Sequence, residues 1–481
     1  MTADVNAALA ASLRGRLIRP TDPDYDEARA VYNGMIDKRP ALIARCVNVA
    51  DVIRCVNFAR DQNLLLAIRG GGHNGPGLGT CEGGLVIDLS MMKSVRVDQA
   101  HRTVRVEPGC TAGDVDHATH AFGLAVPFGI VASTGVAGLT LGGGTGYLTR
   151  KHGLTIDNLL EADVVLADGS LVTASATSHP DLFWALRGGG GNFGVVTSFL
   201  FQAHPVSDVF AGPIFWDAAD AFTVMRAYRD FIGTAPEELG IFVGLKTVPP
   251  MDPFPKPHWG KRACAIIGAY NGTPAQGARA MEPLLSQLPA PLFNWMGPMP
   301  FPAINGLFDP FFPKGLQWYW KGDFVSSLPD EAIKQHIAQA GSPASDFCLM
   351  HLYPINGAVH RVAKDATAWP TRDAMFNMVI AAIDPDPKNA DKLKTWGRAY
   401  WKAVHPFNQG GGYVNFLHDD EVEGRLEATY GDNYARLGAV KAKYDPKNLF
   451  RVNQNIKPAA AADSASTTKR AAGQVDARPQ A

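Results

Sequence analysis

The sequence lacks the features that mark several large classes of protein. Its six cysteines form no Cys-x-x-Cys pair, which argues against a zinc site or a redox dithiol. Scattered single thiols suit a reducing compartment. No segment approaches about 20 uninterrupted apolar residues, and residues 1–19 contain no basic run followed by a long apolar stretch. We therefore expect a cytoplasmic protein without a membrane-spanning helix.

Net charge is also nearly absent. The chain has 45 Lys and Arg against 46 Asp and Glu, so no strong field attracts it to nucleic acid or anionic lipid. A chain of 481 residues exceeds what one hydrophobic core usually organises, so we expect at least two domains. The expected partner is a small molecule of low charge, with no nucleic acid or membrane, and the oligomeric state is left open.

Glycine, by contrast, is abundant, and much of it lies in the three stretches 70–79, 129–147 and 187–196. The first stretch follows a predicted helix at 50–60 and a short apolar run, 64–68, which is typical of a strand. Glycine permits close approach and unusual dihedral angles. Three such stretches therefore predict backbone that packs against one extended ligand.

The first glycine stretch can hold phosphate with its backbone N–H groups. A G-x-G-x-x-G dinucleotide fingerprint needs a helix directly after it, whereas Asn74-Gly-Pro-Gly77 continues the loop. A nicotinamide dinucleotide site is therefore disfavoured. His73 lies in the middle of this loop, and the loop alone favours a histidine that hydrogen-bonds local backbone.

From about residue 208 the composition becomes rich in proline and aromatic residues, as in 248–257 and 308–313. Stiff loops with large side chains suit the rim of an apolar substrate cavity, so we expect a second domain to begin there. Residues 459–481 are rich in Ala, Ser, Thr and charge without periodicity, which predicts a disordered tail.

Four motifs occur in an order that resembles the berberine bridge enzyme-like FAD-linked oxidases, which have the vanillyl-alcohol oxidase (PCMH-type) flavoprotein fold. Segments 69–74, 135–144 and 189–196 resemble the family's cofactor segments, and the stretch from Tyr413 to Asn455 resembles its closing block. The resemblance covers about residues 35–460.

The resemblance implies an α+β fold with a two-lobed PCMH-type FAD-binding domain and a substrate domain in which helices cover an antiparallel sheet. The expected divisions are an N-terminal segment (1–34), the FAD-binding domain (35–207), the substrate-binding domain (208–410), a C-terminal segment that returns to the FAD domain (411–458) and the tail (459–481).

The resemblance also implies FAD, attached covalently through His73. The predicted cofactor contacts come from the glycine stretches and the closing block. They are Arg69, Gly70, Gly71, Gly72, His73, Asn74, Gly77, Gly129, Val131, Thr134, Gly135, Gly138, Leu139, Gly144, Gly190, Gly194, Val196, Tyr413 and Asn415. Many relatives add a second link through a cysteine, and this chain has Val131 at that position. Valine cannot form a thioether, so we predict a single link.

The implied reaction transfers a hydride from a small apolar or aromatic molecule to FAD, with reoxidation by O2 to give H2O2. Relatives use a tyrosine or a glutamate as the base, and the corresponding residues here are Phe416 and Met378, which exchange no proton. The remaining candidates are Tyr353, His351, which shares its strand face, and Tyr413. Each could instead be a core residue whose polar atom is hydrogen-bonded.

The missing bases leave two alternatives open. One is a dehydrogenase that uses another electron acceptor, and the other is a flavin-binding protein without catalysis. Thr134 lies where the family controls access of O2, and its small polar side chain does not decide between the acceptors. His405, His418 and the pair Asp419–Asp420 lie near the surface in this interpretation and show no metal-ligand spacing, so we predict no metal site.

Overall fold

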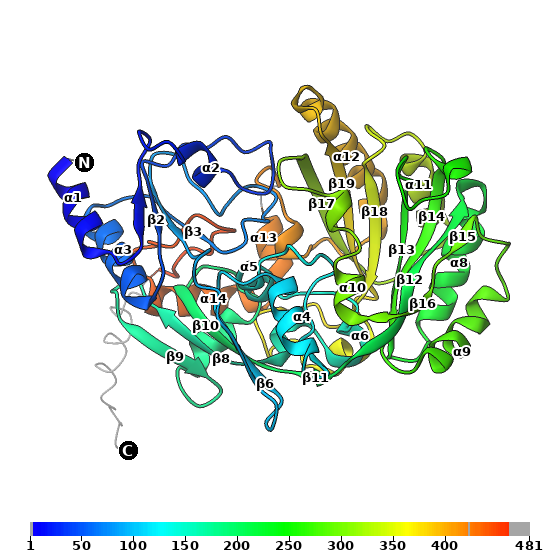
Figure 1. Cartoon of the computed structure of the whole chain (residues 1–481), viewed down its shortest axis with the longest axis horizontal. Helices are drawn as coiled ribbons and strands as arrows, with labels where there is room; N and C mark the ends of the chain where they lie inside the picture. Colours follow the sequence, from blue (N-terminus) through cyan, green and yellow to red (C-terminus); the bar gives the residue numbers. More distant parts are fainter. Residues whose placement is uncertain (1–2, 422–423, 461–481) are drawn as a thin grey trace, which may run out of the picture.

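The computed structural model describes residues 3–421 and 424–460 and has an elongated shape (Figure 1). The predicted disordered tail lies outside these residues beyond position 460. No helix in the described part of the chain is long and apolar enough to cross a bilayer.

The first N-terminal lobe is built on a β-α-β unit. Strand β2 (Leu42–Arg45), helix α3 (Val49–Asp61) and strand β3 (Leu66–Arg69) are followed by β4 (Leu85–Asp88), which pairs in parallel with both strands. Asn48 caps α3 by accepting a hydrogen bond from the N–H of Asp51. The helix and strand predicted before the first glycine stretch are both present.

Residues 1–34 are joined to this lobe. Helix α1 (Ala3–Ser12) contacts α3, and β1 (Arg16–Ile18) pairs antiparallel with β2. Helix α2 (Tyr25–Arg29) follows. The segment that we set apart from the FAD-binding domain therefore contributes an edge strand to its sheet.

The second lobe contains an antiparallel sheet in the order β5-β6-β10-β8-β9. Its strands are β5 (Val95–Asp98), β6 (Thr103–Val106), β8 (Leu159–Val165), β9 (Leu171–Ser175) and β10 (Val195–Gln202). A hairpin turn joins β8 to β9, with the N–H of Leu166 donating to the carbonyl of Ser170. Around this sheet lie α4 (Ala112–His120), α5 (Val136–Gly142), α6 (Thr149–His152), α7 (Pro180–Leu186) and the short pair β7 (Leu124–Ala125) and β11 (His204–Pro205).

A larger antiparallel sheet occupies the other end of the molecule (Figure 1). Its strands are β12 (Asp208–Asp217), β13 (Leu239–Thr247), β14 (Arg262–Tyr270), β15 (Phe293–Asn294), β16 (Gly297–Pro300), β17 (Gln317–Val325), β18 (Leu349–Pro354) and β19 (Phe376–Asp384). The main order is β15-β12-β14-β13-β18-β19-β17, and β16 pairs with β12.

Strand alternation divides this sheet into two different faces. One face packs against α8 (Ala221–Ile232), α9 (Pro274–Leu285), α11 (Asp330–Ala340) and α12 (Ala390–Val404). The other carries an aromatic cluster that includes Phe242, Phe308 and Trp318, and it packs with Tyr32 and Tyr147 of the N-terminal half. Helix α10 (Phe301–Asn305) links this face to α4.

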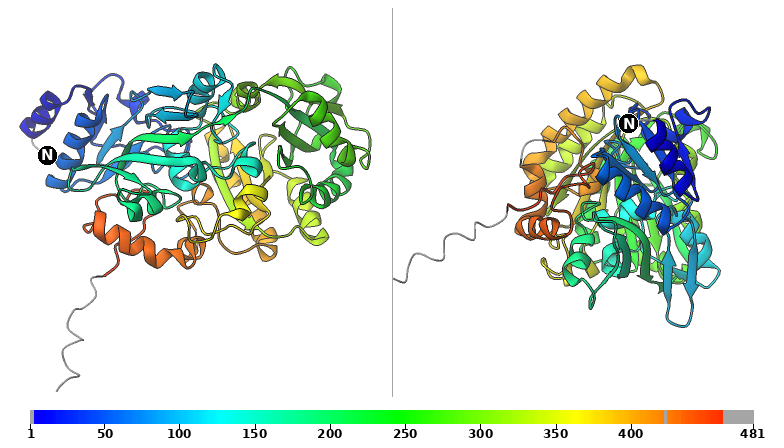
Figure 2. Two further views of the ribbon diagram at one scale, coloured as in Figure 1. Left: turned by 90° about the horizontal axis from the view of Figure 1, so that it is seen from below. Right: turned by 90° about the vertical axis from the view of Figure 1, so that its left-hand side faces the viewer.

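The C-terminal block returns to the N-terminal lobes, and Figure 2 shows its helices, in orange, beside those lobes. Helices α13 (Arg425–Tyr430) and α14 (Asn433–Tyr444) follow the short 3-10 turn η8 (Val414–Phe416). The buried ammonium of Lys441 pairs with Asp445 at 2.6 Å and donates to the carbonyls of Asn192 and Phe450. This cluster fixes the third glycine stretch.

Arg150 joins the second lobe to the larger sheet. Its guanidinium is buried and donates to the carbonyls of Ile232, Ala235, Pro236 and Leu239 and to the side chain of Asn356. Because buried carbonyls need partners, these five hydrogen bonds hold the loop after α8 against α6.

Candidate active site

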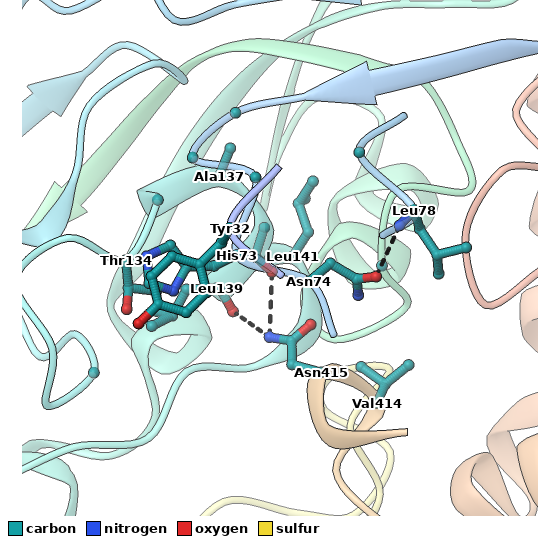
Figure 3. Close-up of a pocket in the computed structure, with 18 of the residues that line it drawn as sticks. Tyr32, His73, Asn74, Leu78, Thr134, Ala137, Leu139, Leu141, Val414 and Asn415 are labelled. Atoms are coloured by element: carbon teal, nitrogen blue, oxygen red, sulfur yellow. Dashed lines mark hydrogen bonds between the residues drawn. The ribbon is translucent and has the colours of Figure 1, made fainter. Parts of the chain in front are cut away.

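A cavity of about 340 Å³ lies between the N-terminal lobes and the aromatic face of the larger sheet. Its wall combines the three glycine stretches, strands β17, β18 and β19, and the C-terminal block. Figure 3 shows part of this wall, with Asn415 beside the second glycine stretch and Tyr32 across the ring of His73. Segments far apart in the sequence therefore meet around one space.

Most of the predicted cofactor contacts line this cavity. They are Arg69, Gly70, Gly71, Gly72, His73, Asn74, Gly129, Val131, Thr134, Gly135, Gly138, Leu139, Gly190, Gly194, Val196, Tyr413 and Asn415. Gly77 and Gly144 are outside the lining, so cofactor contact at these two positions stays a prediction. Both have positive φ, and an added Cβ would collide with Ile36 at Gly77 and with Thr155 at Gly144.

The first two glycine stretches meet backbone to backbone. A Cβ added to Gly71 would lie 2.5 Å from the Cα of Gly135, and one added to Gly135 would lie 2.4 Å from the N of Gly71. At Gly138 and Gly191, by contrast, no atom lies within 4 Å of an added Cβ. The absence of a side chain therefore allows the two loops to touch at Gly71 and Gly135. At Gly138 and Gly191 the space beside the backbone is open.

The polar groups of the wall suit an anionic dinucleotide. The guanidinium of Arg69 is buried, with Nη2 donating to Asp88 at 3.0 Å and Nη1 without a partner among the described residues. An unpaired buried donor beside glycine backbone fits a pyrophosphate. Apolar side chains such as Leu139 and Val196 in the same wall suit planar rings. The residues present therefore fit FAD.

His73 is fixed by two neighbours that the sequence did not reveal. Tyr32 stacks on its ring, with centroids 3.8 Å apart, and Ser133 Oγ lies 3.2 Å from Nε2. Burial lowers the pKa of His73 to about 4, so the ring is neutral at pH 7. The sequence indicates Ser133 as a neighbour of His73 only weakly, through its place next to Thr134 in the second glycine stretch. Nothing in the sequence indicates Tyr32.

Tyr353 and His351 project from the same face of β18, as alternation predicts. The Tyr353 hydroxyl lies 2.8 Å from His351 Nδ1, and both side chains line the cavity. His351 Nε2 is buried and has no partner in the described part of the chain. Burial lowers the pKa of His351 to about 3 and strongly raises the pKa of Tyr353, so both groups are neutral at pH 7.

Tyr413 is already engaged in holding the second glycine stretch. Its hydroxyl accepts hydrogen bonds from the N–H of Gly144 and from Asn415 Nδ2, each at 2.8 Å. Asn415 also donates to the carbonyls of Gly138 and Leu139, as Figure 3 shows for two of its contacts. Burial raises the pKa of Tyr413 to about 12. These contacts favour a positioning role over that of a base.

The position assigned to the family's glutamate base needs correction. Met378 is fully buried on the helix-covered face of the sheet, away from the cavity. A shift of one residue along a strand changes the face, and its neighbour Val379 is the one that lines the cavity. Valine has no ionisable group, so the conclusion that no carboxylate acts there is unchanged. Phe416 does line the cavity, with its ring 4.9 Å from that of Tyr413.

His418 is buried, with 8% exposure, and not at the surface as expected. Its possible ligand atom and those of Asp419 and Asp420 lie within 4.8 Å of one another. Asp420 is already paired with Lys321 and Arg398, which offset its charge. The absence of a metal site therefore stays a prediction.

The fold and the cavity define a flavoprotein oxidoreductase, and comparison with known proteins agrees. The family described as "FAD binding domain" matches residues 40–175, and that described as "Berberine and berberine like" matches residues 412–457. A FAD-linked oxidoreductase of Dictyostelium discoideum is 31% identical over 93% of this chain and 95% of its own length. The chain belongs to the berberine bridge enzyme-like family of FAD-linked oxidoreductases.

Two further relatives are oxidases. The (R)-6-hydroxynicotine oxidase of Paenarthrobacter nicotinovorans is 30% identical over 93% of this chain and 97% of its own length. The solved 6-hydroxy-D-nicotine oxidase of Arthrobacter nicotinovorans superposes with a TM-score of 0.83 at 27% identity, covering 93% of this chain and 99% of that one. This protein is thus an FAD-dependent oxidoreductase, which sets aside the interpretation as a flavin-binding protein without catalysis.

A second solved relative, the glucooligosaccharide oxidase of Acremonium strictum, is described as carrying a 6-S-cysteinyl, 8α-N1-histidyl FAD. It is 23% identical, has a TM-score of 0.83, and covers 95% of this chain and 100% of its own. At this identity the likeness concerns the fold.

We predict that Gly71→Ala weakens FAD binding at least about 10-fold, because the new methyl group must separate two backbones that touch. The ratio of flavin to protein absorbance after purification measures it. Gly297→Ala is the matched control, since no atom lies within 4 Å of its added Cβ. Full flavin content in folded Gly71→Ala protein would contradict the role of this contact.

Proposed function

We propose that the protein oxidises a small, largely apolar or aromatic molecule, with FAD held covalently through His73 alone and reoxidised by O2 to give H2O2. The Tyr353–His351 pair, which faces an aromatic cavity bordered by the three glycine stretches, carries this proposal. Bound FAD supplies the two-electron acceptor for a substrate hydride, and the chain orients the substrate and moves its proton.

The pair can take a proton without forming a buried phenolate. Tyr353 donates its own proton to His351 Nδ1, 2.8 Å away, while its oxygen accepts the proton of a substrate O–H or N–H group. His351 becomes the cation and Tyr353 stays neutral. This relay suits the site because Phe416 and Val379 offer no base.

The aromatic wall orients the substrate and excludes water. Trp318, Trp320 and Phe312 line the cavity together with Phe416. The Nε1 atoms of both tryptophans are buried without a partner among the described residues, so they are available to a polar atom of the substrate. Flat apolar walls with few polar groups favour aromatic or apolar molecules.

Three observations support a single histidyl link. The His73 ring is neutral at pH 7, and Ser133 Oγ lies 3.2 Å from its Nε2. A histidyl link exists in the glucooligosaccharide oxidase named above. Val131 lines the cavity where a cysteine would be needed for a second link. Oxygen as the acceptor is supported by the names of the oxidase relatives.

We expect the flavin to stay on the protein after acid precipitation and to map by mass spectrometry to one peptide that contains His73. His73→Ala should release all of it. Ser133→Ala should slow attachment while leaving reversible FAD binding, because Nε2 loses the partner that orients the ring. Free flavin in precipitated wild type, or flavin on a peptide containing Val131, would contradict the single link.

We expect Tyr353→Phe to slow flavin reduction by about 100-fold or more, since the relay loses its hydroxyl. Anaerobic stopped-flow bleaching by an aromatic alcohol or amine found by screening measures it, and return of the colour in air within seconds identifies an oxidase. His351 can accept a proton only while it is neutral. Because its pKa is about 3, we expect the rate of flavin reduction to fall through protonation of His351 only in very acidic solution.

Tyr434→Phe is the control for this variant, since Tyr434 lies outside the cavity lining and makes no side-chain hydrogen bond among the described residues. Unchanged bleaching in Tyr353→Phe at every pH would exclude Tyr353. Reoxidation that takes minutes would instead indicate a dehydrogenase.

A further inference from the structure

Lys246 is a cation that the proposed chemistry does not use, and it lies outside the cavity lining but beside two aromatic rings that belong to it. It lies on β13 opposite Leu349 of β18, and two residues before it Gly244 lies opposite His351. Leu349 and His351 both line the cavity. By alternation Lys246 therefore shares the sheet face that bears the proton relay.

The ammonium lies among aromatic rings that belong to the cavity wall. Lys246 Nζ is 5.9 Å from the ring centroid of Phe308 and 5.8 Å from that of Phe312, at the outer limit of a cation–π contact. The ring of Phe308 is 6.4 Å from that of His351. Cavity, relay and ammonium are thus neighbours.

Within the described residues, Lys246 pairs with no carboxylate, in contrast to Lys321 and Lys441, whose ammonium groups have acidic partners at 3.0 Å or less. Lys246 is half-buried, and partial loss of water around a cation without an anion lowers its pKa to about 8. The uncompensated charge also lowers the pKa of His351. The site is therefore short of one negative charge.

We propose that Lys246 binds an oxyanion of the substrate, so that the substrate is an aromatic or apolar molecule that carries a carboxylate. This inference rests on the proposed function and narrows its substrate class to molecules with a carboxylate. The composition of the chain had suggested only a partner of low charge. The bound carboxylate neutralises Lys246 and removes its repulsion from the proton that His351 receives. Binding of the correct substrate thereby makes the relay a better proton acceptor.

Calorimetric titration of the purified holoprotein tests this without turnover, using benzoate and its neutral analogue benzamide as probes. Wild type should bind benzoate at least about 10-fold more tightly than benzamide. Lys246→Met should weaken benzoate binding about 10- to 100-fold and leave benzamide unchanged, because a charge-assisted hydrogen bond is lost. Lys246→Arg should keep the preference.

Lys256→Met is the matched control. It removes a lysine whose ammonium also lies 5.9 Å from an aromatic ring, that of Trp259, but this ring does not line the cavity, whereas Phe308 and Phe312 beside Lys246 do. Should Lys246→Met not fold, as judged by flavin content and circular dichroism, Lys246→Gln replaces it. Equal binding of benzoate and benzamide to wild type, or a benzoate affinity that survives loss of the charge, would overturn the inference.

Failure of the two proposals can be told apart. If no substrate bleaches the flavin and the preference for benzoate depends on Lys246, the proposed reaction fails and the anion site stands. If aromatic substrates bleach the flavin and carboxylates show no preference, the reaction stands and the anion site fails.

Discussion

The contact between Gly71 and Gly135 is the constraint on which the site depends. Two loops from different parts of the FAD-binding half touch through backbone atoms, and no side chain could be accommodated between them. The first loop carries Arg69 and His73, and the second carries Ser133 and the start of α5. Because the loops touch, Ser133 reaches His73, and Arg69, whose Nη1 has no partner among the described residues, lines the same cavity. The positions of the predicted cofactor contacts thus depend on the packing of these two loops.

The larger sheet supplies the other side of the site through strand alternation. Odd-numbered residues of β18, including His351 and Tyr353, face the cavity, and even-numbered ones pack against helices. The same rule places Val379 in the cavity and Met378 in the core. A single sheet therefore provides both a hydrophobic core that stabilises the domain and one wall of the cavity, which the proposed function assigns to the substrate.

The closing block connects these two halves. Tyr413 and Asn415 bind the second glycine stretch, and Lys441 binds the third, so residues near the end of the chain fix loops near its beginning. Arg150 secures the junction from the other direction. The cavity is consequently assembled from parts of the chain that lie far apart in the sequence.

The sequence by itself determined the helix and strand before the first glycine stretch and the shared face of His351 and Tyr353, because residue spacing along one element is a local property. The cofactor class followed from the resemblance of four ordered motifs to a known family. The sequence did not reveal that Met378, at the position assigned to the family's glutamate base, faces the helix-covered core. Only the tertiary structure decided that Tyr32 and Ser133 hold His73, that Tyr413 is occupied, and that Lys246 has no acidic partner among the described residues. These facts depend on contacts between distant residues, and such contacts leave no periodic signal in a single chain.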